Sequence, residues 1–67
     1  MTAGNELEAA MARRGLKKSI VADHLGISLT SLKRKTTNQC EFKMSEVQKL
    51  VELLHLTDDE MRNIFFA

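Results

Sequence analysis

Residues 15–38 read GLKKSIVADHLGISLTSLKRKTTN, and this stretch decides the fold. Its first half predicts a helix over residues 18–25, because apolar side chains recur there at helical spacing: Val21, Ala22 and Leu25. Gly26 ends this helix at a position that favours positive φ angles. Ser28 is a suitable N-cap for a second helix over residues 29–37, since its hydroxyl can accept from the free N–H groups of the first turn. We therefore expect two short helices joined by a tight turn.

The second of these helices is poor in apolar residues. Leu32 is its one clear core residue, and the others from position 30 onward are polar or cationic: Thr30, Ser31, Lys33, Arg34, Lys35, Thr36 and Thr37. A helix of this composition contributes little to a hydrophobic core. It is held by one anchor and presents a polar face to a partner.

Three further helices complete an expected all-α, compact five-helix bundle. The first covers residues 5–14 and ends at Gly15, a left-handed C′ position. The fourth begins after Ser45, which is expected to form a capping box with Gln48, while Met44 packs across the helix start.

The fifth helix begins with a second capping box, formed by Thr57 and Glu60. It ends with Phe65 and Phe66, which point about 100° apart on a helix. We expect one of the two phenylalanines to be buried. The other either stays partly exposed or contributes to a contact between two copies of the chain, together with Ile64 or Met61.

Length and composition limit the remaining possibilities. Sixty-seven residues make one domain, 1–67. No apolar run approaches the roughly 20 residues of a membrane span, and a single cysteine, Cys40, suits a reducing cytoplasm. His24 and His55 are too scattered to form a zinc motif with it. We therefore predict a cytoplasmic protein that is not an enzyme, with no cofactor, metal, small-molecule ligand or membrane partner.

Charge is distributed unevenly along the chain. Residues 13–43 hold eight Lys and Arg against two acids, a balance of +6, whereas residues 1–12 sum to −2 and residues 44–67 to −3. A basic middle between acidic ends is typical of a domain that presents one face to phosphate. The three phenylalanines, with no Trp or Tyr, are too few for a base-stacking platform, which favours duplex DNA over single strands.

The stretch quoted above resembles the helix-turn-helix of the Xre-type family of lambdoid repressors and Cro proteins. The matching positions are Leu16, Val21, Ala22, Leu25, Gly26, Ile27, Ser28 and Leu32. The segments SLTSLKRK, EFKMSEV and LLHLTDDEMRNIFF look like those of short regulators from phages and mobile elements. The resemblance implies a lambda repressor-like DNA-binding domain, a transcriptional regulator of Cro or repressor type that binds operator DNA as a homodimer on two-fold related half-sites, associated with the bacterial nucleoid.

The resemblance also implies roles for individual residues, because this motif places its second helix in the major groove. The family's base-reading positions fall on Leu29, Thr30 and Arg34, with Lys33 close by. Positions suited to phosphate contacts are Lys17, Lys18, Ser28, Lys35, Thr37 and Asn38.

The chain departs from the family pattern in two places. Lys17 and Lys18 stand where the family has Thr or Ser followed by Gln, so the usual glutamine contact is not carried over. Cations here oppose the helix dipole. They either contact a DNA phosphate or are surface variation with a small cost in stability. Ile20 stands at a usually polar position, where it either fills a gap against the later helices or remains exposed.

Two other functions remain open at the level of sequence. The chain could be the antitoxin of a toxin–antitoxin pair, which requires a protein partner. It could also be a helical adaptor that binds protein alone. The cationic helix over residues 29–37 argues against the adaptor, since protein-binding helices usually present an apolar stripe.

Overall fold

The computed structural model describes residues 1–66 and contains five helices, with no strand among those residues. Their bounds are α1 Gly4–Arg13, α2 Lys18–Leu25, α3 Leu29–Thr36, α4 Met44–Leu54 and α5 Asp58–Phe65. The expected compact all-α bundle of five helices is confirmed. α1 and α3 differ from their expected ranges by one residue at the ends, and none of the five helices is long and apolar enough to cross a membrane.

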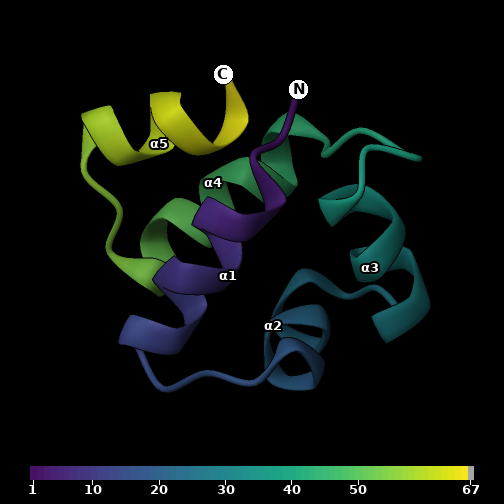
Figure 1. The fold of residues 1–67 in the computed structure, drawn as a ribbon. Coiled ribbons are helices and arrows are strands. Elements are labelled where there is room, and N and C mark those ends of the chain that lie inside the picture. The colour runs from purple at the N-terminus through teal and green to yellow at the C-terminus, as the bar shows by residue number, and fades with distance from the viewer. Residues whose placement is uncertain (67) are drawn as a thin grey trace.

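The core is built from side chains of all five helices, and α5 contributes Ile64 and Phe65. Leu7, Val21, Leu32 and Leu50 are fully buried and come from α1, α2, α3 and α4. α2 packs against α3 and α4, while α1 packs against α3 and α5. In Figure 1, α1 crosses the middle of the molecule, with α5 above it, α2 below it and α3 to the right. α3 therefore lies at the edge of the bundle.

The tight turn between α2 and α3 has the expected geometry. Gly26 adopts φ 71°, in the left-handed region, and Gly15 does the same after α1 at φ 66°. Open space surrounds the position of a Cβ at Gly26, so backbone conformation and not crowding favours glycine there. Ile27, in the turn, packs against the core while partly buried. Ala22 is buried as expected.

The expected start of the fourth helix is wrong. α4 begins at Met44, one residue before the predicted cap Ser45, and Lys43 is the N-cap. The Oε1 atom of Glu46 accepts from the Lys43 backbone N at 2.8 Å, so Glu46 supplies the carboxylate of the cap in place of Gln48. Met44 is 60 % exposed and does not pack across the helix start.

The start of the fifth helix is as expected. The Thr57 hydroxyl accepts from the Glu60 N at 3.2 Å, and the Glu60 carboxylate accepts from the Thr57 N at the same distance. Phe65 is buried and Phe66 is 59 % exposed, which confirms that one phenylalanine of the pair is buried. Ile20 is 44 % exposed and so fills no gap in the core.

The segment before α1 connects two distant parts of the fold. Ala3 N donates to the Ile64 carbonyl of α5 at 2.6 Å. Gly4 packs so closely on α3 that a Cβ there would lie 2.3 Å from the Thr36 carbonyl oxygen. The two ends of the described chain consequently lie near each other at the top of Figure 1. The segment formed by residues 2–4 holds the end of α3 against the rest of the bundle.

Candidate nucleic-acid interface

α3 has one face turned inward and one turned to solvent. Leu32, Lys35 and Thr36 lie on the inward face: Leu32 and Thr36 are buried, and the Lys35 side chain is 12 % exposed. Four residues share the outward face and are exposed: Leu29, Thr30, Lys33 and Arg34. This division follows from the helical repeat, since residues three and four positions apart lie on the same side of a helix.

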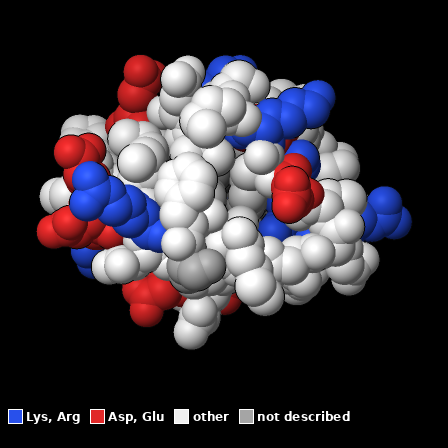
Figure 2. Space-filling view, turned by 90° about the horizontal axis from the view of Figure 1, so that it is seen from above, with Lys and Arg blue, Asp and Glu red and all other residues white. Residues whose placement is uncertain are grey.

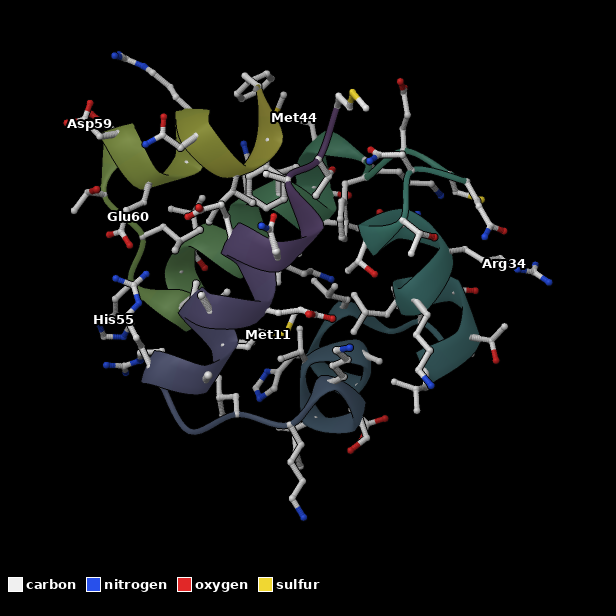
Figure 3. The ribbon with its side chains drawn as sticks, in the orientation of Figure 1. Met11, Arg34, Met44, His55, Asp59 and Glu60 are labelled. Carbon is white, nitrogen blue, oxygen red and sulfur yellow. The ribbon has the colours of Figure 1, made fainter. Side chains whose placement is uncertain are left out.

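The outward face contains the four positions that the resemblance assigns to base reading. Leu29 is 38 % exposed, and the Arg34 side chain points away from the body of the molecule (Figure 3). Within the described part of the chain, the guanidinium of Arg34 and the ammonium of Lys33 form no ion pair or hydrogen bond. Both cations are therefore available to an external ligand.

Ser28 and Thr37 lie at the two ends of α3 and bond to its backbone. The Ser28 hydroxyl accepts from Ser31 N at 3.1 Å and bonds to the Ser31 hydroxyl at 3.0 Å, which confirms Ser28 as the N-cap. The Thr37 hydroxyl lies 3.0 Å from the Lys33 carbonyl and 3.2 Å from the Arg34 carbonyl. Both residues are exposed, but their hydroxyls already serve the helix ends.

The Lys35 side chain points into the protein and not into solvent. Its ammonium donates to the Glu46 carboxylate at 3.0 Å and to the Glu41 carbonyl at 3.2 Å, and it lies 5.8 Å from the centre of the Phe42 ring. In the free protein the Lys35 ammonium is therefore engaged in an internal ion pair, and the phosphate contact predicted for it stays a prediction. The physical reason is the phase of the helix, which turns Lys33 and Arg34 outward and Lys35 inward.

Asn38 is likewise occupied within the protein. Its Oδ1 accepts from Thr2 N at 2.8 Å, and its Nδ2 donates to the Thr2 carbonyl at 3.0 Å. The residue adopts φ 65°, a left-handed conformation that asparagine tolerates better than most residues. These two hydrogen bonds, the Asn38–Thr2 clasp, hold the N-terminal segment, and the phosphate contact predicted for Asn38 stays a prediction.

Lys17 and Lys18 lie at the start of α2. Lys17 is the N-cap and is exposed, and its side chain makes no capping bond. Lys18 forms an ion pair with Glu8 of α1 that leaves both side chains partly exposed. No acid lies in the first turn of α2. Lys17 can therefore bind an anion directly, whereas Lys18 must first break its ion pair with Glu8.

Acidic groups gather at the opposite end of the molecule from α3. Asp58, Asp59 and Glu60 form the first turn of α5, and Asp59 and Glu60 lie far from Arg34 in Figure 3. Seen from above in Figure 2, most of the red atoms lie on the side of α5, with a blue side chain among them, and more of the blue atoms lie on the side of α3. The unequal charge along the sequence thus becomes an unequal charge across the surface.

Arg13 and Arg14 face this acidic end and not α3. Arg13 forms an ion pair with Glu60, and its hydrogen bond is the main cause that holds the pKa of the Glu60 carboxyl below its ordinary value. The guanidinium of Arg14 lies 3.3 Å from the Nε2 atom of His55. The basic surface available to a ligand is therefore smaller than the +6 balance of residues 13–43 suggests.

Metal-ligating side chains do not gather anywhere in residues 1–66: no three His, Cys, Asp or Glu residues lie close enough to share an ion. Cys40 is a free, exposed thiol in the loop after α3.

The sequence analysis missed two residues that determine how α3 is held. Glu46 is buried beside Lys35, and a glutamate three residues after Lys43 is the local signal that could have identified it as part of a cap. Thr2 has no such signal, because its partner Asn38 is 36 positions away.

Comparisons of the chain with protein-family models, with curated proteins and with solved structures find no match. The resemblance to the Xre-type family therefore rests on the motif residues alone.

Proposed function

We propose that this protein binds double-stranded DNA sequence-specifically, with α3 in the major groove, and acts as a transcriptional regulator of repressor type. The observation that carries the proposal is the outward face of α3. It places Thr30, Lys33 and Arg34 side by side, exposed and without internal partners for the two cations. A short helix with a cationic outer face, held at the edge of a small bundle, has the dimensions and charge that the major groove admits.

Each residue of this face has a specific role in the proposal. Arg34 donates two hydrogen bonds to guanine O6 and N7, which discriminates against other bases by about 1–3 kcal/mol. Thr30 hydrogen-bonds a base edge, and Leu29 contacts a thymine methyl group. Lys33 contacts a neighbouring base or the sugar-phosphate backbone. Together these four side chains would read one half-site.

Phosphate contacts come from the start of α2. Lys17 and Lys18 lie at the positive end of that helix, where backbone N–H groups and two cations favour an anion. Such contacts fix the register of the protein on the duplex and carry no sequence information. In this proposal Ser28 and Thr37 position α3 by capping it. The protein acts in the cytoplasm, at the nucleoid.

We also propose that two copies bind paired half-sites. A groove of about 200 Å³ lies near the chain ends, and the exposed side chains of Met44 and Phe66 are part of its lining. Ile64 is buried and Met61 is partly buried, so Met44 replaces them as the companion of Phe66. Met44 lies at the top of Figure 3 and Arg34 points to the right, so pairing through the groove leaves the outward face of α3 free.

The size of this apolar contact indicates where pairing occurs. A stable dimer buries about 800 Å² per partner, far more than two side chains can supply. We therefore expect the two copies to pair on DNA, where adjacent half-sites hold them together, and to separate in free solution.

Selection from a pool of random duplexes at about 100–150 mM salt tests DNA binding, because non-specific binding is weakened there. The proposal expects a two-fold symmetric consensus with half-sites about 34 Å apart. If no sequence is enriched above the salt-sensitive background, α3 is not a sequence reader.

The pairing is tested with Phe66→Ser. This variant should bind an isolated half-site like the wild type and lose cooperativity on the full site. Ile20→Ser, which alters an exposed apolar side chain outside the groove lining, is the control and should retain cooperativity. If wild-type and Phe66→Ser proteins show equal cooperativity, the groove does not join two copies, and a different protein partner, as in the antitoxin alternative, becomes the better explanation.

A further inference from the structure

Lys35 and Glu46 form the most enclosed ion pair of the described residues. Their side chains are 12 % and 8 % exposed. The same Oε1 atom of Glu46 accepts from the Lys35 ammonium at 3.0 Å and from the Lys43 backbone N at 2.8 Å. One carboxylate oxygen therefore joins α3 to the first turn of α4.

The surroundings of this pair reach α5 through aromatic contacts. The Lys35 ammonium lies 5.8 Å from the centre of the Phe42 ring, which meets the ring of Phe65 edge to face at 5.6 Å. The same ammonium donates to the Glu41 carbonyl. The loop between α3 and α4 is consequently fixed at the same point as the helix.

Lys35 lies on the opposite side of α3 from the outward face. Successive residues of an α-helix are turned by about 100°. Relative to Lys35, the four outward residues lie between about 120° and 260° around the axis, a range centred close to the opposite side. The direction of the Lys35 side chain therefore sets the direction in which Arg34 and its neighbours point.

The other contacts of α3 constrain its rotation less directly, and the close approach of Gly4 and the hydrogen bonds of Asn38 to Thr2 act at its C-terminal end. Leu32 is its one fully buried apolar side chain, and apolar contact is non-directional. A roll of about 20° displaces atoms at the outer radius of a helix, about 5–6 Å, by about 2 Å. A binding site needs its groups held within about 0.5 Å, so the apolar contact of Leu32 alone does not fix the rotation of α3 closely enough.

We infer that Lys35 is a positioning residue for DNA reading: its pair with Glu46 sets the rotation of α3 about its own axis and so aims the outward face. The inference rests on the proposed function for its consequence on DNA, but the orientation of the helix can be measured without DNA. The pair affects the orientation of α3 more than the free energy of unfolding, because the cost of burying two charges offsets most of their attraction.

The test separates orientation from stability with a double variant. Lys35→Met alone leaves the Glu46 carboxylate buried without its cation and should lower the unfolding midpoint. In Lys35→Met/Glu46→Gln the charge is gone, and the amide oxygen of the introduced glutamine can still accept from Lys43 N, so the midpoint should return close to that of the wild type. Lys49→Met, at an exposed lysine of α4, is the matched control for the Lys35 substitution.

Residual dipolar couplings of the α3 amides, measured against those of α2 and α4, report the orientation of the helix in free protein. The double variant should show a rotated or averaged α3, and Lys49→Met should show the wild-type orientation. Wild-type couplings in α3 of the double variant would overturn the inference, whatever the protein does on DNA.

Binding to the selected duplex and to a scrambled one gives the second measurement. The double variant should lose about tenfold in the ratio of the two affinities, close to the value of one base contact, while the salt dependence stays that of the wild type. A slope reduced by about 0.9 with equal loss on both duplexes would show a phosphate contact by Lys35 instead. If α3 rotates but the wild type prefers no sequence, the positioning role of Lys35 stands and the proposed function fails.

Discussion

The side chain of Asn38 makes two hydrogen bonds to the backbone of a single residue, Thr2, 36 positions earlier in the chain. This amide clasp is how the end of α3 is fastened to the segment that precedes α1. Asn38 holds its left-handed φ of 65° at the same time. Asn38 therefore affects stability in two ways, through its hydrogen bonds to Thr2 and through its tolerance of a left-handed backbone conformation.

Substitution of Asn38 separates these two contributions. Asn38→Gly keeps the left-handed backbone accessible and removes two hydrogen bonds, which should cost about 1–3 kcal/mol. Asn38→Ala removes the same bonds and adds backbone strain, so it should cost about 1 kcal/mol more. Chemical denaturation of both variants gives the comparison. Equal losses would mean that the positive φ carries no cost here.

Gly4→Ala should destabilise the protein, although alanine is the better helix former. The new Cβ would meet the Thr36 carbonyl oxygen at 2.3 Å, and forcing the backbones apart should cost about 1–3 kcal/mol. Asn5→Ala, at the exposed neighbouring position, is the control and should be neutral or slightly stabilising. A Gly4→Ala protein as stable as the wild type would show that α1 and α3 separate easily.

Arg34→Ala should relax the base preference at one position of each half-site and leave the fold intact. The side chain points into solvent and has no partner in residues 1–66 that its loss would disturb, so the unfolding midpoint should not change. Selection from random duplexes with the variant and the wild type measures the preference. Arg62→Ala, at an exposed arginine of α5, should leave the consensus unaltered. An unchanged consensus with Arg34→Ala would remove this residue from the base readers.

Glu8→Gln should tighten binding to every duplex, because Glu8 occupies Lys18 in the free protein. Freeing Lys18 from an exposed pair is worth about 0.2–1 kcal/mol, or about 1.5- to 5-fold in affinity. Lys18→Ala should do the reverse and lower the salt slope by about 0.9. Titrations at several salt concentrations give both quantities. Weaker binding by Glu8→Gln would mean that the ion pair holds Lys18 in its productive position.

Stability should fall in acid partly through Glu46. Burial raises the pKa of its carboxyl, but the hydrogen bond from Lys43 N and the Lys35 ammonium outweigh burial and bring the pKa below the ordinary value of 4.5. A carboxyl with a lowered folded-state pKa stabilises the protein above the unfolded-state pKa, and this stability is lost as the pH falls through the folded-state value. Denaturation midpoints from pH 7 to pH 3 measure the effect. In Glu46→Gln that part of the acid dependence should be absent, and an identical pH profile would contradict it.

The helices themselves could be predicted because their boundaries carry local signals. These signals act within a few residues of their own position, and they are Gly15, Gly26, Ser28 and the Thr57–Glu60 box. All five helices begin within about a turn of their expected starts. The prediction of where α4 starts was wrong because two capping patterns overlap there. Ser45 with Gln48 competes with Lys43 and Glu46, and the second is favoured because Glu46 also pairs with Lys35 across the fold.

The candidate site could be predicted in part for the same reason. Positions 29, 30, 33 and 34 share a face by helical geometry alone, and the structure exposes that face. The inward direction of the Lys35 side chain could not be predicted from the sequence, because its buried acidic partner is on another helix. The clasp of Asn38 depends on a contact across 36 positions, and no local pattern encodes such a contact.

The N-terminal segment also sets an order of events during synthesis. Thr2 fastens the end of α3, and the neighbouring Ala3 is itself bonded to the carbonyl of Ile64 in α5. The motif of α2 and α3 can form early from local contacts, but its final alignment needs the segment before α1 and, through Ala3, helix α5. A nascent chain would therefore hold α3 loosely until α5 has been synthesised, so that the outward face of α3 reaches its final direction only after the last of the five helices has formed.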